Sequence, residues 1–264
     1  LPDFPWYALA PYGVIARSHP EGAIDLSVGT PVDATPEFIQ AALQEAANSP
    51  GYPVTAGTPQ LREAIERWAR TQLGATGDFG VLPLIGSKEF VAWLPTFVEA
   101  KSVLYPSVAY PTYLVGALLA QAEATAVEID STSWQRADMA WVNSPSNPTG
   151  RVHSEGELRA AITWARQHQS LVVSDECYFE FGDSALPTSI LKFTDGDNRN
   201  ILAVHSLSKR SSMAGYRAAF VIGDPALIAR ILEVRKHAGM IVPLPVQCAM
   251  VAALSDGAHV AEQR

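Results

Sequence analysis

Residues 139–178 read MAWVNSPSNPTGRVHSEGELRAAITWARQHQSLVVSDECY, and this stretch decides the fold. Apolar runs typical of buried strands stand near both of its ends, and residues 154–168 between them have helical periodicity. Ser154 and Glu157 have the Ser-x-x-Glu spacing of a capping box, which indicates where that helix begins. A strand, a helix and a second strand in this order form a crossover unit, whose two strands run parallel.

The same alternation of short apolar runs and amphipathic segments continues on both sides of this unit. We therefore expect an α/β fold, with a mostly parallel sheet that helices cover on both faces. The first thirty residues are rich in proline, glycine and aromatic residues without a clear period, which predicts an arm or an irregular segment that packs on something else. The expected strands are residues 81–85, 102–105, 124–129, 139–142, 171–174, 201–204 and 218–222. The expected helices are residues 87–97, 112–122, 154–168 and 225–237, preceded by two that begin near Thr35 and Thr58.

Composition narrows the classes of function. The chain has 264 residues, 48% of them hydrophobic, which is enough for a large buried core. Its formal net charge of −8 argues against a nucleic-acid partner, whose phosphates require clustered lysine and arginine. No apolar run approaches the roughly 18 residues of a membrane span, and two cysteines do not form a disulfide framework. With no signal-peptide pattern at its start, the chain is expected to be cytoplasmic.

Polar residues follow several of the expected strands. In a parallel sheet ligands bind at the carboxyl ends of the strands, so these residues are candidates for a site. Gly86 and Ser87 precede a helix whose N-terminus suits a phosphate, Asp175 ends a buried strand, and Lys209 and Arg217 follow the next one. Each alone has an ordinary structural explanation, such as a turn, a helix cap or an ion pair. Their order on successive strand ends of one sheet favours a shared site.

Three segments carry a resemblance to a known family: residues 144–150, 175–178 and 206–217. They resemble the fold-type I, pyridoxal-phosphate-dependent aminotransferases of class I/II, and the resemblance covers nearly the whole chain from Gly29 onward. More closely, residues 84–89, 109–113 and 206–210 are similar to the actinobacterial succinyldiaminopimelate aminotransferases of lysine biosynthesis.

The resemblance implies three catalytic residues, Lys209, Asp175 and Tyr178. Lys209 corresponds to the lysine that bonds covalently to pyridoxal phosphate and then moves the substrate's proton, while Asp175 pairs with the pyridine nitrogen. Tyr178 and Asn147 correspond to the residues that hydrogen-bond the ring's 3′-oxygen. Tyr110 corresponds to the aromatic that stacks on the ring, although Tyr113 is an alternative for that place.

The remaining implied contacts concern the phosphate, the substrate and a second subunit. Tyr52 corresponds to a tyrosine that reaches the phosphate of the neighbouring subunit, which implies a homodimer with a shared active site. Gly29 corresponds to a glycine near the substrate carboxylate, and no metal is implied. The implied phosphate-binding residues are Gly86, Ser87, Lys88, Ser206, Ser208 and Arg217.

The resemblance also implies a division of the chain. Residues 1–30 would form an N-terminal arm or part of a small domain, and residues 31–264 the large cofactor-binding domain. Family members continue for roughly a hundred residues more, so the C-terminal small domain is expected to be absent from this chain. The arginine that binds the substrate α-carboxylate would lie in that absent part.

The expected function is transfer of an amino group between L-glutamate and an oxo acid, with N-succinyl-2-amino-6-oxopimelate as the expected acceptor. Two enzyme alternatives share the cofactor: an aspartate-, alanine- or aromatic-type aminotransferase, and a carbon–sulfur β-lyase. A third alternative is a non-catalytic cofactor-binding sensor. The cofactor motifs do not separate the enzymes, because the fate of the substrate carbanion depends on residues that contact the substrate.

Overall fold

A seven-stranded sheet with the order β1-β7-β6-β5-β4-β2-β3 is the centre of the computed structural model, which describes residues 1–3, 5–26, 29–182 and 187–264. Neighbouring strands from β6 to β3 are parallel, and β7 is antiparallel to both β1 and β6. The mostly parallel sheet predicted from the sequence is therefore confirmed. The strands are β1 (Gly80–Ile85), β2 (Ser102–Pro106), β3 (Glu123–Val127), β4 (Met139–Asn143), β5 (Leu171–Asp175), β6 (Ile201–Ser206) and β7 (Ala218–Gly223).

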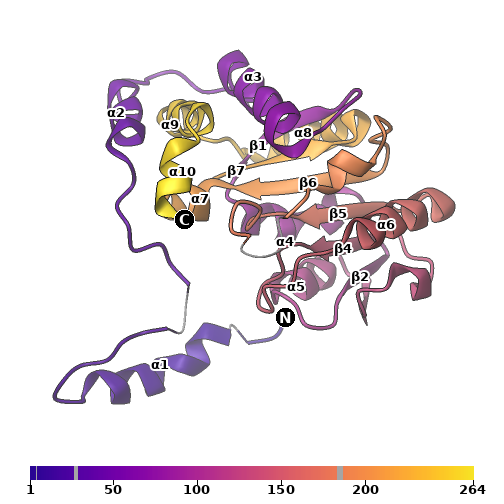
Figure 1. Cartoon of the computed structure of the whole chain (residues 1–264), viewed down its shortest axis with the longest axis horizontal. Helices are drawn as coiled ribbons and strands as arrows, with labels where there is room; N and C mark the ends of the chain where they lie inside the picture. The colour runs from indigo at the N-terminus through magenta and orange to yellow at the C-terminus, as the bar shows by residue number, and fades with distance from the viewer. Residues whose placement is uncertain (4, 27–28, 183–186) are drawn as a thin grey trace.

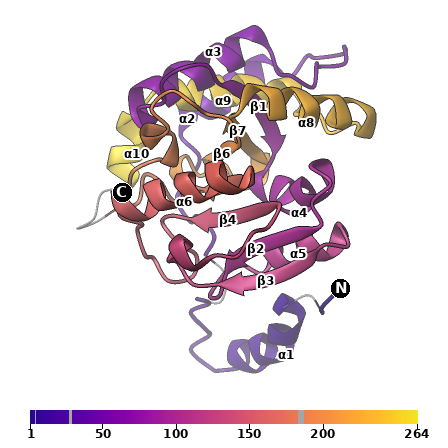
Figure 2. The ribbon, with the colours of Figure 1, turned by 90° about the vertical axis from the view of Figure 1, so that its right-hand side faces the viewer.

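Helices cover both faces of this sheet, as the views in Figures 1 and 2 show. One face packs against α4, α5 and α8, and the other against α3, α6 and α9, so each face has its own apolar cluster. The helices are α1 (Pro5–Arg17), α2 (Glu37–Glu45), α3 (Pro59–Trp68), α4 (Ser87–Phe97), α5 (Thr112–Leu119), α6 (Glu155–His168), α7 (Leu207–Arg210), α8 (Pro225–Ala238), α9 (Leu244–Ser255) and α10 (Ala258–Gln263).

The central strands are apolar along most of their length because both faces are covered. Every residue of β4, β5, β6 and β7 is buried, as expected for strands between two layers of helices. The predicted capping box is present at the start of α6, where Ser154 accepts from the Glu157 N–H and Glu157 accepts from the Ser154 N–H. Asp224 likewise caps α8, where its carboxylate accepts from the N–H groups of Ala226 and Leu227.

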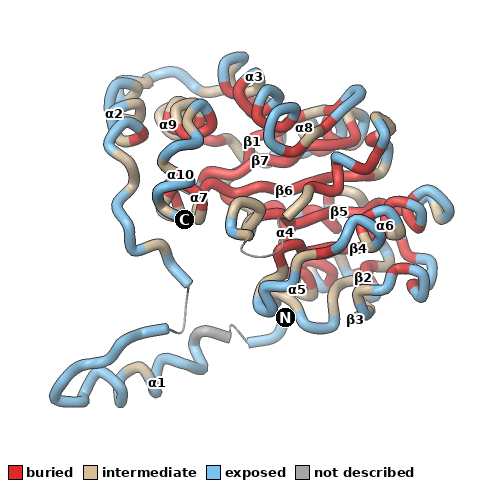
Figure 3. Tube along the Cα trace, in the orientation of Figure 1, coloured by how far each residue is buried: buried red, intermediate tan, exposed pale blue. Residues whose placement is uncertain are grey.

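The N-terminal region differs from its sequence-based prediction. Residues 5–17, expected to be irregular, form helix α1, which contains Pro11. The helix includes Ala8, Leu9 and Ala10, residues of high helix propensity. Figure 1 shows α1 apart from the sheet, and Figure 3 shows most of this region as exposed. Tyr7, Tyr12 and Ile15 are correspondingly exposed.

Neither a membrane span nor a metal cluster is found among the described residues. No helix in those ranges has the length and apolarity that crossing a membrane requires. In the same part of the chain, no three His, Cys, Asp or Glu side chains gather closely enough to hold a metal ion.

Candidate active site

Parallel strand pairing brings the main predicted residues to one edge of the sheet. Asp175 is the last residue of β5, and Lys209 lies in α7, which follows β6 directly. Asn143 ends β4 opposite Asp175, so the loop that carries Asn147 leaves the sheet at the same edge. This clustering follows from the fold, because parallel strands end side by side.

Asp175 is a buried carboxylate whose hydrogen-bond donors in the described structure are uncharged. Its residue is 6% exposed, and its carboxylate accepts from the Tyr113 hydroxyl at 2.8 Å and from the Cys177 N–H at 3.2 Å. Burial raises the pKa of Asp175, while hydrogen bonds from Cys177 and Tyr113 act against the increase. Neither donor carries a charge, so a cationic partner would stabilise the carboxylate in its ionised form.

The structure separates the roles of two neighbouring tyrosines. Tyr113 is fully buried, stacks on Trp141 with ring centroids 5.0 Å apart, and donates to Asp175. It therefore orients the carboxylate and has no exposed face for a cofactor ring. Tyr110 is half-buried and meets Tyr113 edge to face at 6.0 Å, which leaves it as the candidate for stacking.

Lys209 meets Gly29, a residue 180 positions earlier in the chain. Its Nζ donates to the Gly29 carbonyl oxygen, so the structure brings these two predicted residues together. Burial lowers the pKa of Lys209, which increases the fraction of neutral amine near neutral pH. A neutral amine is the form that can act as a nucleophile or accept a proton.

Gly86 and Arg217 form a cationic corner at the start of α4. Gly86 precedes α4 with a φ of +79°, and a Cβ there would overlap the Arg217 guanidinium, so the contact requires glycine. Arg217 is held by its Nη1, which donates to the Ala214 carbonyl at 2.9 Å. The helix that begins at Ser87 has no side-chain cap, which leaves its first N–H groups available to an anion.

The predicted serines lie on the neighbouring turn. The side chain of Ser206, at the end of β6, accepts from the Ser208 N–H at 3.1 Å and so shapes the start of α7. Ser206 is buried and Ser208 half-buried, whereas Lys88 is exposed on the first turn of α4.

The sequence indicated no role for Asn143, and it indicated Tyr113 only as an alternative to Tyr110 for stacking on the ring. Asn143 is buried; its Nδ2 donates to the Asp175 carbonyl at 2.9 Å, and its Oδ1 accepts from the Asn147 N–H at 2.7 Å. It ties the Asn147 loop to the strand that carries Asp175. Tyr113 likewise positions the Asp175 carboxylate, to which its hydroxyl donates. In the sequence, Asn143 directly follows an expected strand and Tyr113 stands at the start of an expected helix. Neither position indicates which residue the side chain will hydrogen-bond.

Burial differs among three further residues of the site region: Tyr178, Tyr52 and Arg210. Tyr178 is half-buried, and burial raises its pKa, with further contributions from Cys177 and Asp175. Tyr52 is fully exposed. Arg210, next to Lys209 in the chain, is buried, pairs with Glu180 and donates to the Ala253 carbonyl at 3.1 Å.

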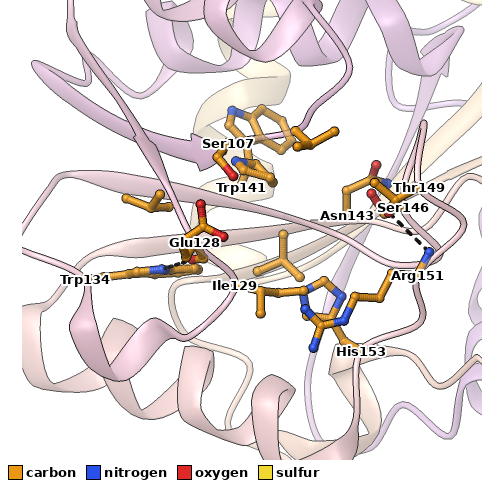
Figure 4. A pocket seen from close by; sticks show the side chains of 14 residues that line it. Ser107, Glu128, Ile129, Trp134, Trp141, Asn143, Ser146, Thr149, Arg151 and His153 are labelled. Atoms are coloured by element: carbon orange, nitrogen blue, oxygen red, sulfur yellow. Dashed lines mark hydrogen bonds between the residues drawn. The ribbon is translucent and has the colours of Figure 1, made fainter.

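A separate cavity of about 170 Å³ lies under the loop that follows β4 (Figure 4). Its wall includes Trp134, Asn143, Arg151 and His153, and none of its lining residues except those of this loop belongs to a predicted cofactor motif. Burial lowers the pKa of His153 to about 4, so its imidazole is neutral near pH 7. Asn143 thus stands between this cavity and Asp175.

Residues 21–264 match the family model of class I and II aminotransferases. The chain belongs to this family. It is 50% identical over 271 residues to the 4-dedimethylamino-4-oxo-anhydrotetracycline transaminase OxyQ of Streptomyces rimosus, covering all of this chain and 76% of that protein. It is 51% identical over 272 residues to the probable aminotransferase Rv1178 of Mycobacterium tuberculosis, again covering all of this chain but 65% of that protein.

A solved structure supports the fold independently. The probable N-succinyldiaminopimelate aminotransferase from Thermus thermophilus superposes with a TM-score of 0.90 at 28% identity, over 98% of this chain and 75% of that chain. Class I and II aminotransferases depend on pyridoxal phosphate, so the predicted cofactor is confirmed at the level of the family.

The residues present fit this cofactor. Among the described residues no cation hydrogen-bonds to Asp175, and a protonated pyridine nitrogen would supply one. The corner of Gly86 and Arg217 would accept a phosphate. Lys209 follows the end of the neighbouring strand β6, and its pKa is lowered. A lysine that bonds to an aldehyde requires this, because the neutral amine is the nucleophile.

Proposed function

We propose that this aminotransferase transfers an amino group between L-glutamate and an oxo acid. The proposal depends most on one observation. At adjacent strand ends lie a buried carboxylate, Asp175, whose hydrogen-bond donors among the described residues are uncharged, and a lysine of lowered pKa, Lys209. Bound pyridoxal phosphate supplies the electron sink for the carbanion at the substrate α-carbon. The protein supplies the proton transfer, the ion pair and the anchoring contacts.

Each predicted residue has a proposed part in this reaction. The Lys209 amine would take the proton from the substrate α-carbon and deliver it to the C4′ carbon of the cofactor, while Asp175 would keep the pyridine nitrogen protonated. Tyr178 and Asn147 donate to the ring's 3′-oxygen, and Tyr110 covers one face of the ring. Gly86, Ser87, Lys88, Ser206, Ser208 and Arg217 hold the phosphate, and Gly29 lies beside the substrate carboxylate.

The proposed domain organisation follows the same assignment. Residues 31–264 form the large domain, and residues 1–30 an arm or part of a small domain. Tyr52, fully exposed in this chain, would complete the phosphate site of a second subunit in a homodimer.

For the acceptor we propose N-succinyl-2-amino-6-oxopimelate, and hence a step of lysine biosynthesis. The sequence resemblance and the likeness to the Thermus thermophilus protein, named as a probable N-succinyldiaminopimelate aminotransferase, support this choice. A second candidate is a polycyclic ketone, because OxyQ, which is 50% identical, is named as a transaminase of an oxo-anhydrotetracycline.

An absorbance titration tests the proposal. The protein reconstituted with pyridoxal phosphate should show the visible band of lysine-bound cofactor and lose it on addition of L-glutamate, with a gain of the pyridoxamine phosphate band. Adding the succinylated oxo acid should then restore the first band, whereas restoration only by a polycyclic ketone would favour the second candidate. A band that ignores glutamate, or release of ammonia and pyruvate from a cysteine conjugate, would contradict transamination and favour a sensor or a β-lyase.

A further inference from the structure

The helix that carries Lys209 is too short to hold its own position. Helix α7 (Leu207–Arg210) is a single turn of four residues between β6 and the loop that follows. An isolated turn of this length is unstable, because helix formation requires several hydrogen bonds beyond the first turn. The place of the Lys209 backbone must therefore be fixed by contacts from elsewhere in the fold.

Helix α10 supplies one of these contacts directly. The Nε2 of Gln263 donates to the Lys209 carbonyl oxygen at 3.0 Å and reaches the Ser212 Oγ at 3.4 Å. Thr35 adds a hydrogen bond from its hydroxyl to the Ser212 carbonyl at 2.7 Å. The residues on either side of the α7 C-terminus are thus held from two distant parts of the chain.

His259, one turn earlier on α10, supplies a second contact. Its Nδ1 lies 2.7 Å from the Asp256 carboxylate, and its Nε2 lies 2.9 Å from the hydroxyl of Ser211. The His259 side chain is 8% exposed and meets the Phe38 ring edge to face at 5.4 Å. With a proton on Nδ1 shared with Asp256, Nε2 accepts from Ser211, two residues after Lys209.

The hydrogen-bonded series Asp256–His259–Ser211 resembles the catalytic triad of a hydrolase. The surroundings of Ser211, however, exclude its action as a nucleophile. Ser211 is fully buried, and Arg210 Nη1 lies 3.3 Å from its oxygen. No substrate carbonyl could reach that hydroxyl. The hydrogen bonds therefore act on the segment that follows Lys209.

We propose that Gln263 and His259 are positioning residues for Lys209, which fix its backbone so that its amine reaches the reacting atoms. The proposal rests on the proposed function of Lys209 as the cofactor-binding lysine. A lysine that must first bond to the cofactor and then move a proton at the substrate α-carbon is sensitive to displacement of its backbone. A shift of about 1 Å at a catalytic group can reduce a rate by about a hundredfold.

The Gln263→Glu variant tests this directly, because it keeps the shape of the side chain and removes the donor to the Lys209 carbonyl. In the reconstituted holoenzyme we expect the rate of conversion by L-glutamate to fall about tenfold, with less than about a twofold change in glutamate affinity. We also expect the pH at which the lysine-bound cofactor band changes to shift. Gln72→Glu, the same change at an exposed glutamine, is the matched control.

A second variant covers the case in which Gln263→Glu does not fold. His259→Phe keeps a ring beside Phe38 and removes both hydrogen bonds, and it should alter the same pH titration and the same rate in the same direction. If a variant loses thermal stability but its folded fraction keeps the wild-type rate and pH titration, the contacts are only structural and the proposal is overturned. If wild-type protein itself shows no conversion by glutamate, the proposed function fails instead.

Discussion

Two parts of the predicted cofactor site differ in how completely this chain builds them. At the ends of β5 and β6, Asp175 and Lys209 are buried or half-buried, and each has a hydrogen-bond partner within the chain. Tyr52, predicted to bind the same cofactor's phosphate, is fully exposed. The difference teaches that sheet register brings the two strand ends of the first pair together within one chain, whereas the proposed contact of Tyr52 depends on a second subunit.

Replacing Lys209 should have the largest effect of any single change. In Lys209→Ala we expect complete loss of the lysine-bound cofactor band and of turnover, because the variant has no amine of lowered pKa at that strand end. The fold should survive, since the amine contributes only a hydrogen bond to Gly29 to the described part of the chain. Absorbance and circular dichroism measure the two outcomes.

The exposed Lys236, which pairs with Glu233 on α8, provides the matched control. Lys236→Ala should keep both the band and the turnover. An unchanged band in Lys209→Ala would remove Lys209 from its proposed role and leave the strand-end cluster without a nucleophile.

Replacing Asp175 should have the next largest effect. An amide in Asp175→Asn cannot form an ion pair with the pyridine nitrogen, and removal of one partner of a buried pair costs about 3 to 5 kcal/mol. We expect the single-turnover rate with L-glutamate to fall by about a hundredfold to a thousandfold, with a smaller loss of cofactor affinity.

Tyr113→Phe sharpens this prediction, because it removes only the hydroxyl that donates to Asp175. Its rate should lie between those of the wild type and Asp175→Asn. A wild-type rate in Asp175→Asn would show that the buried carboxylate is structural.

The sheet and its carboxyl edge could be predicted from the sequence, because each strand is marked by its own short apolar run. A strand such as residues 171–175 is recognisable by its apolar run, and parallel neighbours end together, so the clustering of Asp175 and Lys209 followed from the pattern. The structure extends β6 to Ser206, two residues beyond the predicted end. This difference did not move any predicted site residue off the edge.

What the sequence did not predict depends on contacts between distant residues. Arg210 is buried because Glu180, thirty positions earlier, meets it. His259 reaches Ser211 across 48 positions, and no periodicity indicates that pairing. Likewise, Tyr110 and Tyr113 are equivalent by spacing, and burial by Trp141 separates them only in three dimensions.

Replacing Tyr52 should have the smallest effect, and it tests the exposed half of the comparison. Tyr52→Phe removes one hydroxyl, which is worth about 1 kcal/mol, so cofactor affinity should fall about fivefold. Equilibrium titration with pyridoxal phosphate measures this. Tyr7→Phe, at another exposed tyrosine, should leave the affinity unchanged.

Mixing two defective chains distinguishes a shared site from a site within one chain. In a mixed dimer of Tyr52→Phe and Lys209→Ala, one site combines the intact Lys209 of the first chain with the intact Tyr52 of the second. That site should bind cofactor with wild-type affinity, so a tight-binding population should appear that Tyr52→Phe alone lacks. If Tyr52 instead served the site of its own chain, the only sites with Lys209 would still lack the hydroxyl, and mixing would change nothing.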